Sequence, residues 1–328
     1  MGIYVSVTIA FIVSKEVYTG VRGIDVTTAG FIHDPKRAFE ITNELNNNQP
    51  KDKWMEIEVY PILDKKPLAL LNVFTKRVKR LPPTPEGVTV KQIFAWQKEL
   101  PNTKVIRVHL PFAYDVPDLW CRALGDLKNP RHFLWMYALG AAVNKKGIEL
   151  AQKLEELQDR EVGISAHTNI IKGFSRDGKL EEVKSTVSGS ILVESSGRAK
   201  SSIIKDMRYF CDPAMVASIA EKFNLDGILF GVDHAITEGV DVEAAIENPI
   251  VKRTIQAMHI SGPHHDLIGV GDERLINFLR ILGEIEFPHD VRVAIDYDPR
   301  KIKKQSTSVQ LETVRYARDF ILNHQNKR

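Results

Sequence analysis

The sequence predicts an α/β protein, a (β/α)₈ TIM barrel in one domain that spans residues 1–328. Runs rich in Val and Ile recur along the chain, and helical or irregular segments separate them, as repeated βα units require. Eight such runs occur, which is the number needed to close the barrel. Apolar residues make up 43% and charged residues 27% of the chain, the balance of a globular protein with a large core.

The expected strands are short apolar segments bounded by turn or helix signals. The first has β-branched residues in alternation, and it lacks the basic start and the small-residue cleavage site of a signal peptide. We therefore expect it to be the first strand of the barrel. The eight expected strands are residues 2–12, 54–62, 104–112, 161–168, 189–195, 226–234, 257–261 and 291–296.

Helical patterns follow most of these strands. Asp34-Pro35 and Asp212-Pro213 have the order of an N-cap and a first helical residue, where proline loses no hydrogen bond. Two connections are long, residues 14–53 and 67–101, so we expect insertions after the first and second strands. The expected helices are residues 35–46, 131–157, 213–223, part of 242–258, 273–286 and 308–323.

Charge and composition indicate which partners and which cellular compartment the sequence favours. The net charge of +3 is small for 328 residues, so no global field indicates nucleic acid, although a local basic segment could bind phosphate. The two cysteines, Cys121 and Cys211, are typical of a reducing compartment. No run approaches the roughly 18 apolar residues of a membrane span. We expect a cytoplasmic protein without a membrane partner.

Ionisable residues gather at the ends of six consecutive expected strands. Barrel enzymes place their chemistry there and in the loops that follow. One histidine at a strand end is more often structural, but charged residues in succession are rarely buried unless they are paired or bind metal. The pattern therefore predicts a divalent-metal site at the mouth. The strand-end residues are His109, His167, Glu194, Asp233 with His234, His259 and Asp296.

The residue types favour particular metals. Imidazole with carboxylate suits zinc, manganese or iron, and we expect zinc first and manganese second. Because strand side chains alternate, only one of Asp233 and His234 should face the mouth unless the chain leaves strand geometry there. The same alternation makes Asp298 a possible substitute for Asp296.

The order of these residues resembles the xylose-isomerase-like barrel superfamily and, within it, the endonuclease IV family, also termed AP endonuclease family 2. The resemblance covers most of the chain from the third expected strand onward, where His109 with Pro111-Phe112 matches the family's His-x-Pro-aromatic motif. His265, four residues before Gly269, matches its loop histidine. The metal ligands that the resemblance implies are His109, His167, Glu194, Asp233, His234, His259, His265 and Asp296.

The chain departs from the family pattern at defined places. Gly231 and Pro263 stand where the family has aspartates, and Asp296 replaces a glutamate. The resemblance therefore implies a well-preserved metal position of His109, His167 and Glu194. A weakened position would use Glu194, His259, Asp296 and Asp233, and a third would use His234 and His265.

The leading function that the resemblance implies is a metal-dependent phosphodiesterase. It would hydrolyse DNA at abasic or damaged sites through a metal-activated hydroxide. The implied catalytic residues are Glu194, His109 and Asp296. A basic run at residues 76–80 could contact a phosphate backbone. The expected substrate-binding residues are Phe112, Arg300, Lys301, Lys303 and Lys304.

Two other functions stay open at this point. A sugar or sugar-phosphate isomerase or epimerase of the same superfamily would use one metal on Glu194, Asp233, His259 and Asp296, without needing both His109 and His167 as ligands. A barrel that has lost catalysis and acts as a binding protein would explain Gly231 and Pro263. The sequence leaves the oligomeric state open.

Overall fold

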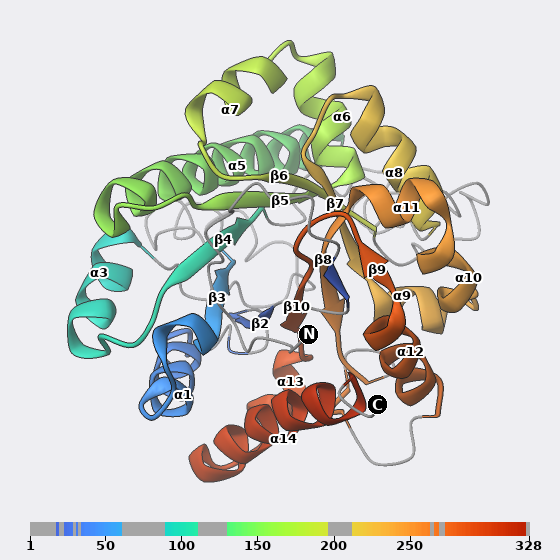
Figure 1. The fold of residues 1–328 in the computed structure, drawn as a ribbon. Helices are drawn as coiled ribbons and strands as arrows, with labels where there is room; N and C mark the ends of the chain where they lie inside the picture. Colours follow the sequence, from blue (N-terminus) through green and yellow to red (C-terminus); the bar gives the residue numbers. More distant parts are fainter. Residues whose placement is uncertain are drawn as a thin grey trace.

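Eight parallel strands close into a barrel in the computed structural model, and helices surround it (Figure 1). The sequence-predicted (β/α)₈ fold is confirmed. The structure describes residues 18–19, 23–28, 31, 34–60, 89–110, 130–195, 212–262, 266–268 and 273–325. The barrel strands, in order, are β2 (Gly23–Thr27), β3 (Glu56–Val59), β4 (Val105–His109), β5 (Gly163–His167), β6 (Ile191–Glu194), β7 (Gly227–Gly231), β8 (Ile255–Ile260) and β10 (Arg292–Ile295).

The first barrel strand is β2, and the expectation that residues 2–12 fill this position was wrong. β10 pairs in parallel with β2, with Ile295 opposite Val26, and this pairing closes the barrel. Residues 2–12 themselves lie outside the described residues. The pattern was misleading because β2 is only five residues long and carries Asp25 at its centre. The supposed insertion of residues 14–53 therefore contains a barrel strand.

The connection between β3 and β4 spans residues 60–104 and contains one described helix, α3. It contains the expected insertion of residues 67–101, although residues 61–88 lie outside the described part of the chain. Outside the barrel, β1 (Tyr18–Thr19) pairs antiparallel with β9 (Glu286–Phe287).

Each predicted helical segment contains a helix, with two corrections, whereas α3, α6, α7, α9 and α13 were not predicted. Asp212 caps α8 by accepting a hydrogen bond from the Ala214 N–H, as predicted, whereas α1 begins at Lys36 without a side-chain cap. Pro249 divides the expected helix at 242–258, because Asn248 caps a new helix there. The described helices are α1 (Lys36–Asn46), η1 (Lys51–Lys53), α3 (Val90–Glu99), α5 (Pro130–Gln158), α6 (Thr168–Arg176), α7 (Leu180–Thr186), α8 (Pro213–Lys222), α9 (Val232–Thr237), α10 (Val242–Glu247), α11 (Pro249–Thr254), α12 (Glu273–Glu284), α13 (Pro299–Ile302) and α14 (Thr307–Gln325).

The two faces of the strands bury different chemistry. Outward residues such as Ile24, Ile57 and Val108 join a large apolar core with the helices. A small, separate apolar cluster inside the barrel consists of Leu192, Leu229 and Ala257. These residues precede Glu194, Gly231 and His259 by two positions and therefore lie on the same inward face of their strands. The rest of the barrel interior contains buried polar and charged side chains.

Three of these charged residues, Asp25, Glu56 and Arg292, form with the partly buried Arg160 what we term the lower cluster, near the amino-terminal ends of the strands. Arg292 makes two hydrogen bonds to Asp25, at 3.0 Å from Nε and 2.5 Å from Nη2, and its Nη2 lies 2.9 Å from Glu56 Oε2. Arg160 pairs with the other oxygen of Glu56. Burial and the two carboxylates act in opposite directions on Arg292, and the carboxylates raise its pKa. The lower cluster therefore holds fixed, mutually compensating charges.

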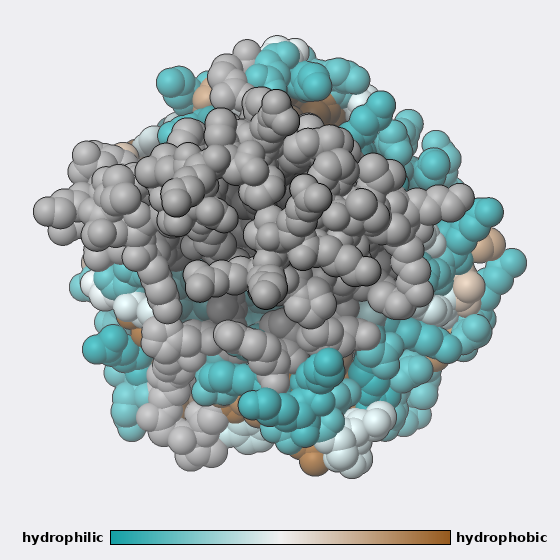
Figure 2. Space-filling model, turned by 180° about the vertical axis from the view of Figure 1, so that it is seen from behind, coloured by the Kyte–Doolittle hydropathy of each residue, from teal (hydrophilic) through white to brown (hydrophobic). Residues whose placement is uncertain are grey.

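The described surface is mainly hydrophilic where it is visible in Figure 2. Its exposed large apolar side chains are spread over four helices, with Phe94 on α3, Leu157 on α5, Met215 on α8, and Val309 and Tyr316 on α14. Among the described helices, none combines the length and the apolar character needed to cross a bilayer.

Candidate metal centre

The carboxyl ends of six barrel strands bring together a second set of buried groups, which we term the upper cluster. Its members contact one another across the barrel, for example from β3 to β8 and from β4 to β6. These strands are not neighbours in the sheet, so the contacts pass through the interior. The upper cluster consists of Glu58, His109, His167, Glu194, His259 and Asp296.

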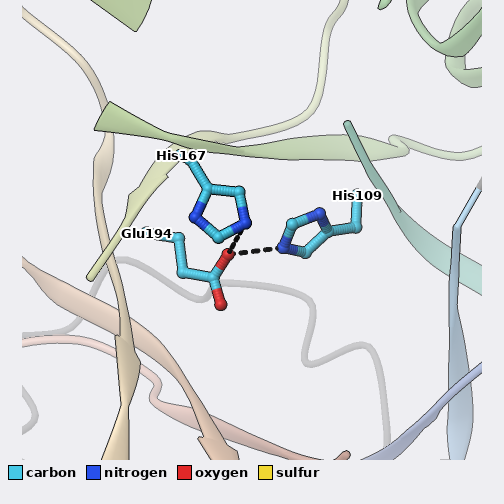
Figure 3. Close-up of side chains that lie close together, drawn as sticks. All are labelled: His109, His167 and Glu194. Atoms are coloured by element: carbon cyan, nitrogen blue, oxygen red, sulfur yellow. Dashed lines mark hydrogen bonds and ion pairs between the residues drawn. The ribbon is translucent and has the colours of Figure 1, made fainter. Parts of the chain in front are cut away.

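Three of these residues form a candidate metal site (Figure 3). Glu194 Oε2 lies 2.6 Å from His109 Nε2 and 3.1 Å from His167 Nε2. One potential ligand atom from each residue lies within 4.8 Å of the other two, and no other such group occurs in the described part of the chain. Two imidazoles and a carboxylate are a donor set that suits zinc and related divalent metals.

The environment of His109 fits metal binding. Its Nδ1 lies 3.1 Å from the Leu110 carbonyl oxygen, and its Nε2 faces Glu194. Since both partners are acceptors, the ring must donate from both nitrogens, or a cation must take the place of the proton on Nε2. Tyr60 stacks on the ring, with centroids 4.2 Å apart and an interplanar angle of 11°, and so restrains its orientation.

His167 provides a neutral imidazole. Burial lowers its pKa to about 4, although the charge of Glu194 opposes this shift. Deprotonated histidine is the form that binds metal. The residue closes β5, and α6 begins directly after it, so the strand end fixes its position.

Glu194 stays ionised despite complete burial. Burial alone would raise its pKa, but His167 and His109, with hydrogen bonds from His109 and His259, hold that pKa well below the usual range. One carboxylate oxygen faces the two histidines of the metal group, and the other lies 3.1 Å from His259 Nδ1.

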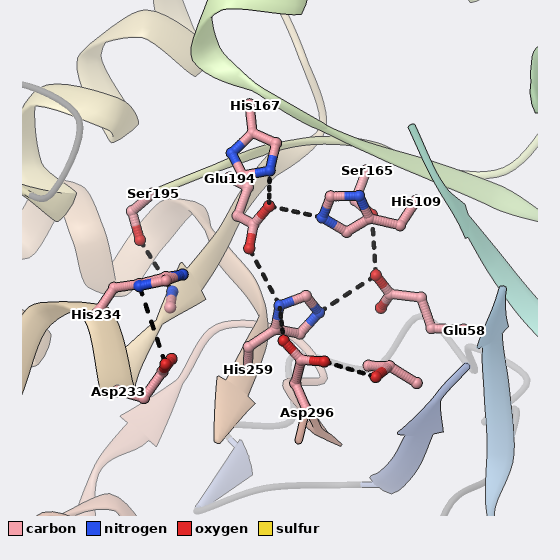
Figure 4. Close-up of polar contacts among 12 residues, drawn as sticks. Glu58, His109, Ser165, His167, Glu194, Ser195, Asp233, His234, His259 and Asp296 are labelled. Atoms are coloured by element: carbon pink, nitrogen blue, oxygen red, sulfur yellow. Dashed lines mark hydrogen bonds and ion pairs between the residues drawn. The ribbon is translucent and has the colours of Figure 1, made fainter. Parts of the chain in front are cut away.

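His259 lies between two carboxylates (Figure 4). Its Nδ1 faces Glu194, and its Nε2 lies 3.2 Å from Glu58 Oε1. Burial lowers the pKa of this histidine, but Glu58 and Glu194 outweigh burial and raise the pKa well above its usual value. In the absence of a cation, His259 is therefore an imidazolium that joins the two carboxylates.

Asp296 extends the upper cluster on the side of β10. Thr27 donates a hydrogen bond of 2.7 Å to Asp296 Oδ1, and Oδ2 lies 3.9 Å from His259 Nδ1. Asp298 is buried too, but β10 ends at Ile295, so strand alternation does not place it beside Asp296. Neither aspartate belongs to the three-residue metal group.

The chain leaves strand geometry before Asp233 and His234, the alternative that we kept open from the sequence. α9 begins at Val232, so both residues lie on a helix. Asp233 is buried and His234 is partly exposed, and His234 Nδ1 lies 3.9 Å from Asp233 Oδ2. Both lie outside the metal group, and their assignment as ligands stays a prediction.

Gly231 ends β7 without room for a side chain. A Cβ atom at this position would lie 2.8 Å from the Ser195 backbone oxygen and 3.0 Å from His234 Cδ2. The aspartate of the endonuclease IV pattern could not fit here without movement of the backbone. This strand end therefore has no space for the carboxylate that the resemblance implied.

Several expected site residues cannot be placed. Phe112, Pro263, His265 and the basic run at 76–80 lie outside the described residues, as does the side chain of Arg300. Lys301 Nζ lies 2.5 Å from Asp266 Oδ2, a hydrogen bond that lowers the pKa of Asp266. Lys303 and Lys304 are exposed.

Sequence reasoning missed Glu58. Its carboxylate accepts hydrogen bonds from Arg107 Nη1 at 3.2 Å and Ser165 Oγ at 3.1 Å, in addition to its contact with His259. The available signal was the pair Glu56 and Glu58, two residues apart inside an expected strand and hence on one face. Glu58 was missed because it lies inside the expected strand 54–62 and not at its end.

No protein-family model and no curated protein matches the sequence. Solved structures with the same fold include an L-ribulose 3-epimerase, which is 13% identical, has a TM-score of 0.52, and covers 93% of this chain and 95% of its own. A D-psicose 3-epimerase with D-tagatose from Clostridium cellulolyticum H10 is 11% identical, with a TM-score of 0.51 and coverages of 91% and 99%. A D-psicose 3-epimerase in the presence of D-fructose is 9% identical, with a TM-score of 0.50 and the same coverages. At these identities the likeness concerns the fold.

Proposed function

We propose that this chain is a divalent-metal-dependent enzyme that isomerises or epimerises a small sugar. The observation that carries the proposal is the one buried candidate metal group among the described residues, with a separate carboxylate, Asp296, close by. Such an arrangement provides the two requirements of the chemistry, a site for a Lewis acid and a group that moves a proton. The three epimerases of similar fold support the same choice.

His109, His167 and Glu194 would hold the metal, zinc in the first place and manganese in the second. A bound divalent cation would polarise a carbonyl and hydroxyl pair of the sugar and so make the neighbouring C–H bond more acidic. The protein prepares the ligands by burial, by the Leu110 carbonyl behind His109, and by the stacked Tyr60 ring.

Asp296 is the best candidate for the proton-moving carboxylate. Its side chain is 8% exposed, against 3% for Glu194 and 0% for Glu58, so it is the most accessible of the three. It would accept a proton from the carbon next to the carbonyl while the electron pair of that C–H bond moves toward the carbonyl oxygen. Return of the proton by Asp296 to the neighbouring carbon gives an isomer, whereas an epimer requires a second acid that delivers a proton to the opposite face of the original carbon.

Glu58 is poorly suited to this role. Burial would raise its pKa, but His259 and then Arg107 outweigh burial and lower the pKa to about 2. A carboxylate of this kind is a weak base near neutral pH. Its position behind His259, without exposure, also separates it from a substrate.

A phosphodiesterase is the second candidate, because His109 and His167 both face Glu194, as the first metal position of the endonuclease IV pattern requires. The steric block at Gly231 argues against the full set of metals that such an enzyme would use. A barrel without catalysis would explain that gap but not the preserved metal group.

The test is incubation of purified protein with a panel of free and phosphorylated ketopentoses and ketohexoses in D₂O, with Mn²⁺, Co²⁺ or Zn²⁺. We expect metal-dependent incorporation of deuterium next to the carbonyl, together with a second sugar as product. A parallel incubation contains duplex DNA with an abasic site. Strand cleavage without deuterium incorporation would replace the proposed function with the second candidate, and metal binding without either reaction would favour the binding protein.

A further inference from the structure

We infer that Glu58 is a positioning residue that, through His259, holds Glu194 in the orientation in which its Oε2 faces both His109 and His167. This inference deepens the proposed function and rests on its metal site. The contacts that carry it run in one line across the barrel, from β3 through β8 to β6 (Figure 4).

Glu58 is itself rigidly held. Oε2 accepts from Arg107, while Oε1 accepts from Ser165 and faces His259 Nε2, so both carboxylate oxygens are engaged. The side chain has 0% exposure, which excludes water as a competing partner. A carboxylate with this many fixed donors can serve as an anchor for the next group.

His259 transmits this orientation. Its two ring nitrogens engage Glu58 on one side and Glu194 on the other, so any rotation of the ring breaks both contacts. Glu194 Oε1 is occupied by His259 Nδ1, and this leaves Oε2 for the metal group. Without the anchor, the Glu194 carboxyl group could rotate and present a mixture of orientations to a metal.

The neighbouring carboxylate on β3 shows that charge compensation alone does not need this arrangement. Glu56 is buried, lies on the same face two residues earlier, and pairs with two arginines, Arg292 and Arg160. Glu58 has its own arginine, Arg107, and nevertheless contacts His259. Glu56 is therefore a matched control for Glu58.

The experiment is a Co²⁺ titration of the full-length, metal-free protein, followed by the visible absorption of bound cobalt. We expect Glu58→Gln to weaken Co²⁺ binding about 10- to 100-fold, the usual effect of losing a group that orients a ligand, and to change the absorption bands. Glu56→Gln should keep the affinity within about threefold, with unchanged bands. The double variant Glu58→Gln/His259→Gln should lose little more than His259→Gln alone, because the two residues act in series.

Ser165→Ala covers the case in which Glu58→Gln does not fold. It removes one hydrogen bond from Glu58 Oε1 without removing charge, and we expect binding to weaken about two- to tenfold. Wild-type affinity and bands in Glu58→Gln, or in Ser165→Ala if the first variant is unfolded, would overturn the inference. Equal losses in Glu56→Gln and Glu58→Gln would overturn it as well.

Failure of the proposed function would look different. If the cobalt results follow the expected pattern while no sugar is converted, the positioning role stands and the assigned reaction does not. If the wild-type protein binds no Co²⁺, both are overturned.

Discussion

The upper and lower clusters place buried carboxylates of one strand in two different chemical settings. Glu56 and Glu58 lie two residues apart on the same face of β3, and both are buried. Glu56 pairs with two arginines, whose charge is permanent, whereas Glu58 pairs with one arginine and a histidine. The difference between the two clusters therefore comes from the residues that pair with the carboxylates. Arginine partners give a stabilising cluster, whereas a histidine partner gives a cluster that can exchange protons or bind a cation.

The two clusters should accordingly respond to different perturbations. A change in the lower cluster leaves a charge buried without compensation, and this lowers stability. A change in the upper cluster affects a site whose donors converge on one point, so it should alter metal binding first.

The largest effect on stability is expected from Arg292→Met. It leaves Asp25 and Glu56 without their shared guanidinium, and breaking a buried pair of this kind costs about 3–5 kcal/mol. Urea unfolding measures the loss. The control Arg253→Met removes an exposed pair with Glu221 and should cost at most about 1 kcal/mol. Equal losses in the two variants would mean that the lower cluster adds no special stability.

Glu194→Gln should have the largest effect on the upper cluster. Removal of the charged ligand shared by both histidines should weaken Co²⁺ or Zn²⁺ binding by at least about 100-fold and abolish sugar conversion. Calorimetric titration measures the affinity. Full metal stoichiometry and a normal rate would show that Glu194 is structural.

Acid should destabilise the metal-free protein through the upper cluster. The pKa of His167 is lowered to about 4, so its contribution is present above the unfolded value of 6.5 and is lost as the pH falls from 6.5 toward 4. The pKa of Glu58 is lowered to about 2, so its contribution is lost from 4.5 toward 2. His259, whose pKa is raised, keeps its full contribution below 6.5 and loses it only as the pH rises.

The unfolding free energy should therefore decline on the order of a few kcal/mol between pH 6.5 and 4, and further below pH 4. His167→Gln should flatten the upper part of this decline and Glu58→Gln the lower part. Urea titrations at successive pH values measure it. A decline that both variants leave unchanged would assign acid sensitivity to groups outside the upper cluster.

A moderate effect is expected from Gly231→Ala, at the one upper strand end where no side chain fits. The added Cβ meets the Ser195 backbone oxygen, and crowding of this kind costs about 1–3 kcal/mol. Gly173→Ala, where a Cβ meets nothing within 4 Å, is the control and should not destabilise the protein. If Gly231→Ala is as stable as the wild type, steric exclusion of the aspartate is not the explanation.

The smallest effect is expected from the double variant Lys303→Ala/Lys304→Ala. Both residues are exposed, and a small neutral sugar should not depend on them, so kcat and KM should stay within about twofold. Binding of abasic-site DNA at several salt concentrations is the contrasting measurement. A salt slope that flattens by about 0.9 per lysine would indicate phosphate contacts and favour the phosphodiesterase.

The sequence alone was sufficient for the barrel and for the residues of the metal group. Apolar periodicity is a local property, and it placed seven of the eight barrel strands. His109, His167 and Glu194 could be brought together in advance, because the carboxyl ends of parallel barrel strands share one mouth. Whether they bind a metal remains a prediction.

Only the tertiary structure decided the first strand, the role of Glu58 and the missing side chain at Gly231. Each depends on a partner far away in the sequence. Asp25 can be buried inside β2 because it pairs with Arg292 on β10, which is 267 residues away in the sequence. Glu58 contacts His259, which is 201 residues away. The space at Gly231 is limited by the backbone oxygen of Ser195, the residue that follows β6. Local patterns record how a segment buries its apolar side chains, but the compensation of buried charge and the space for a Cβ depend on the closed barrel.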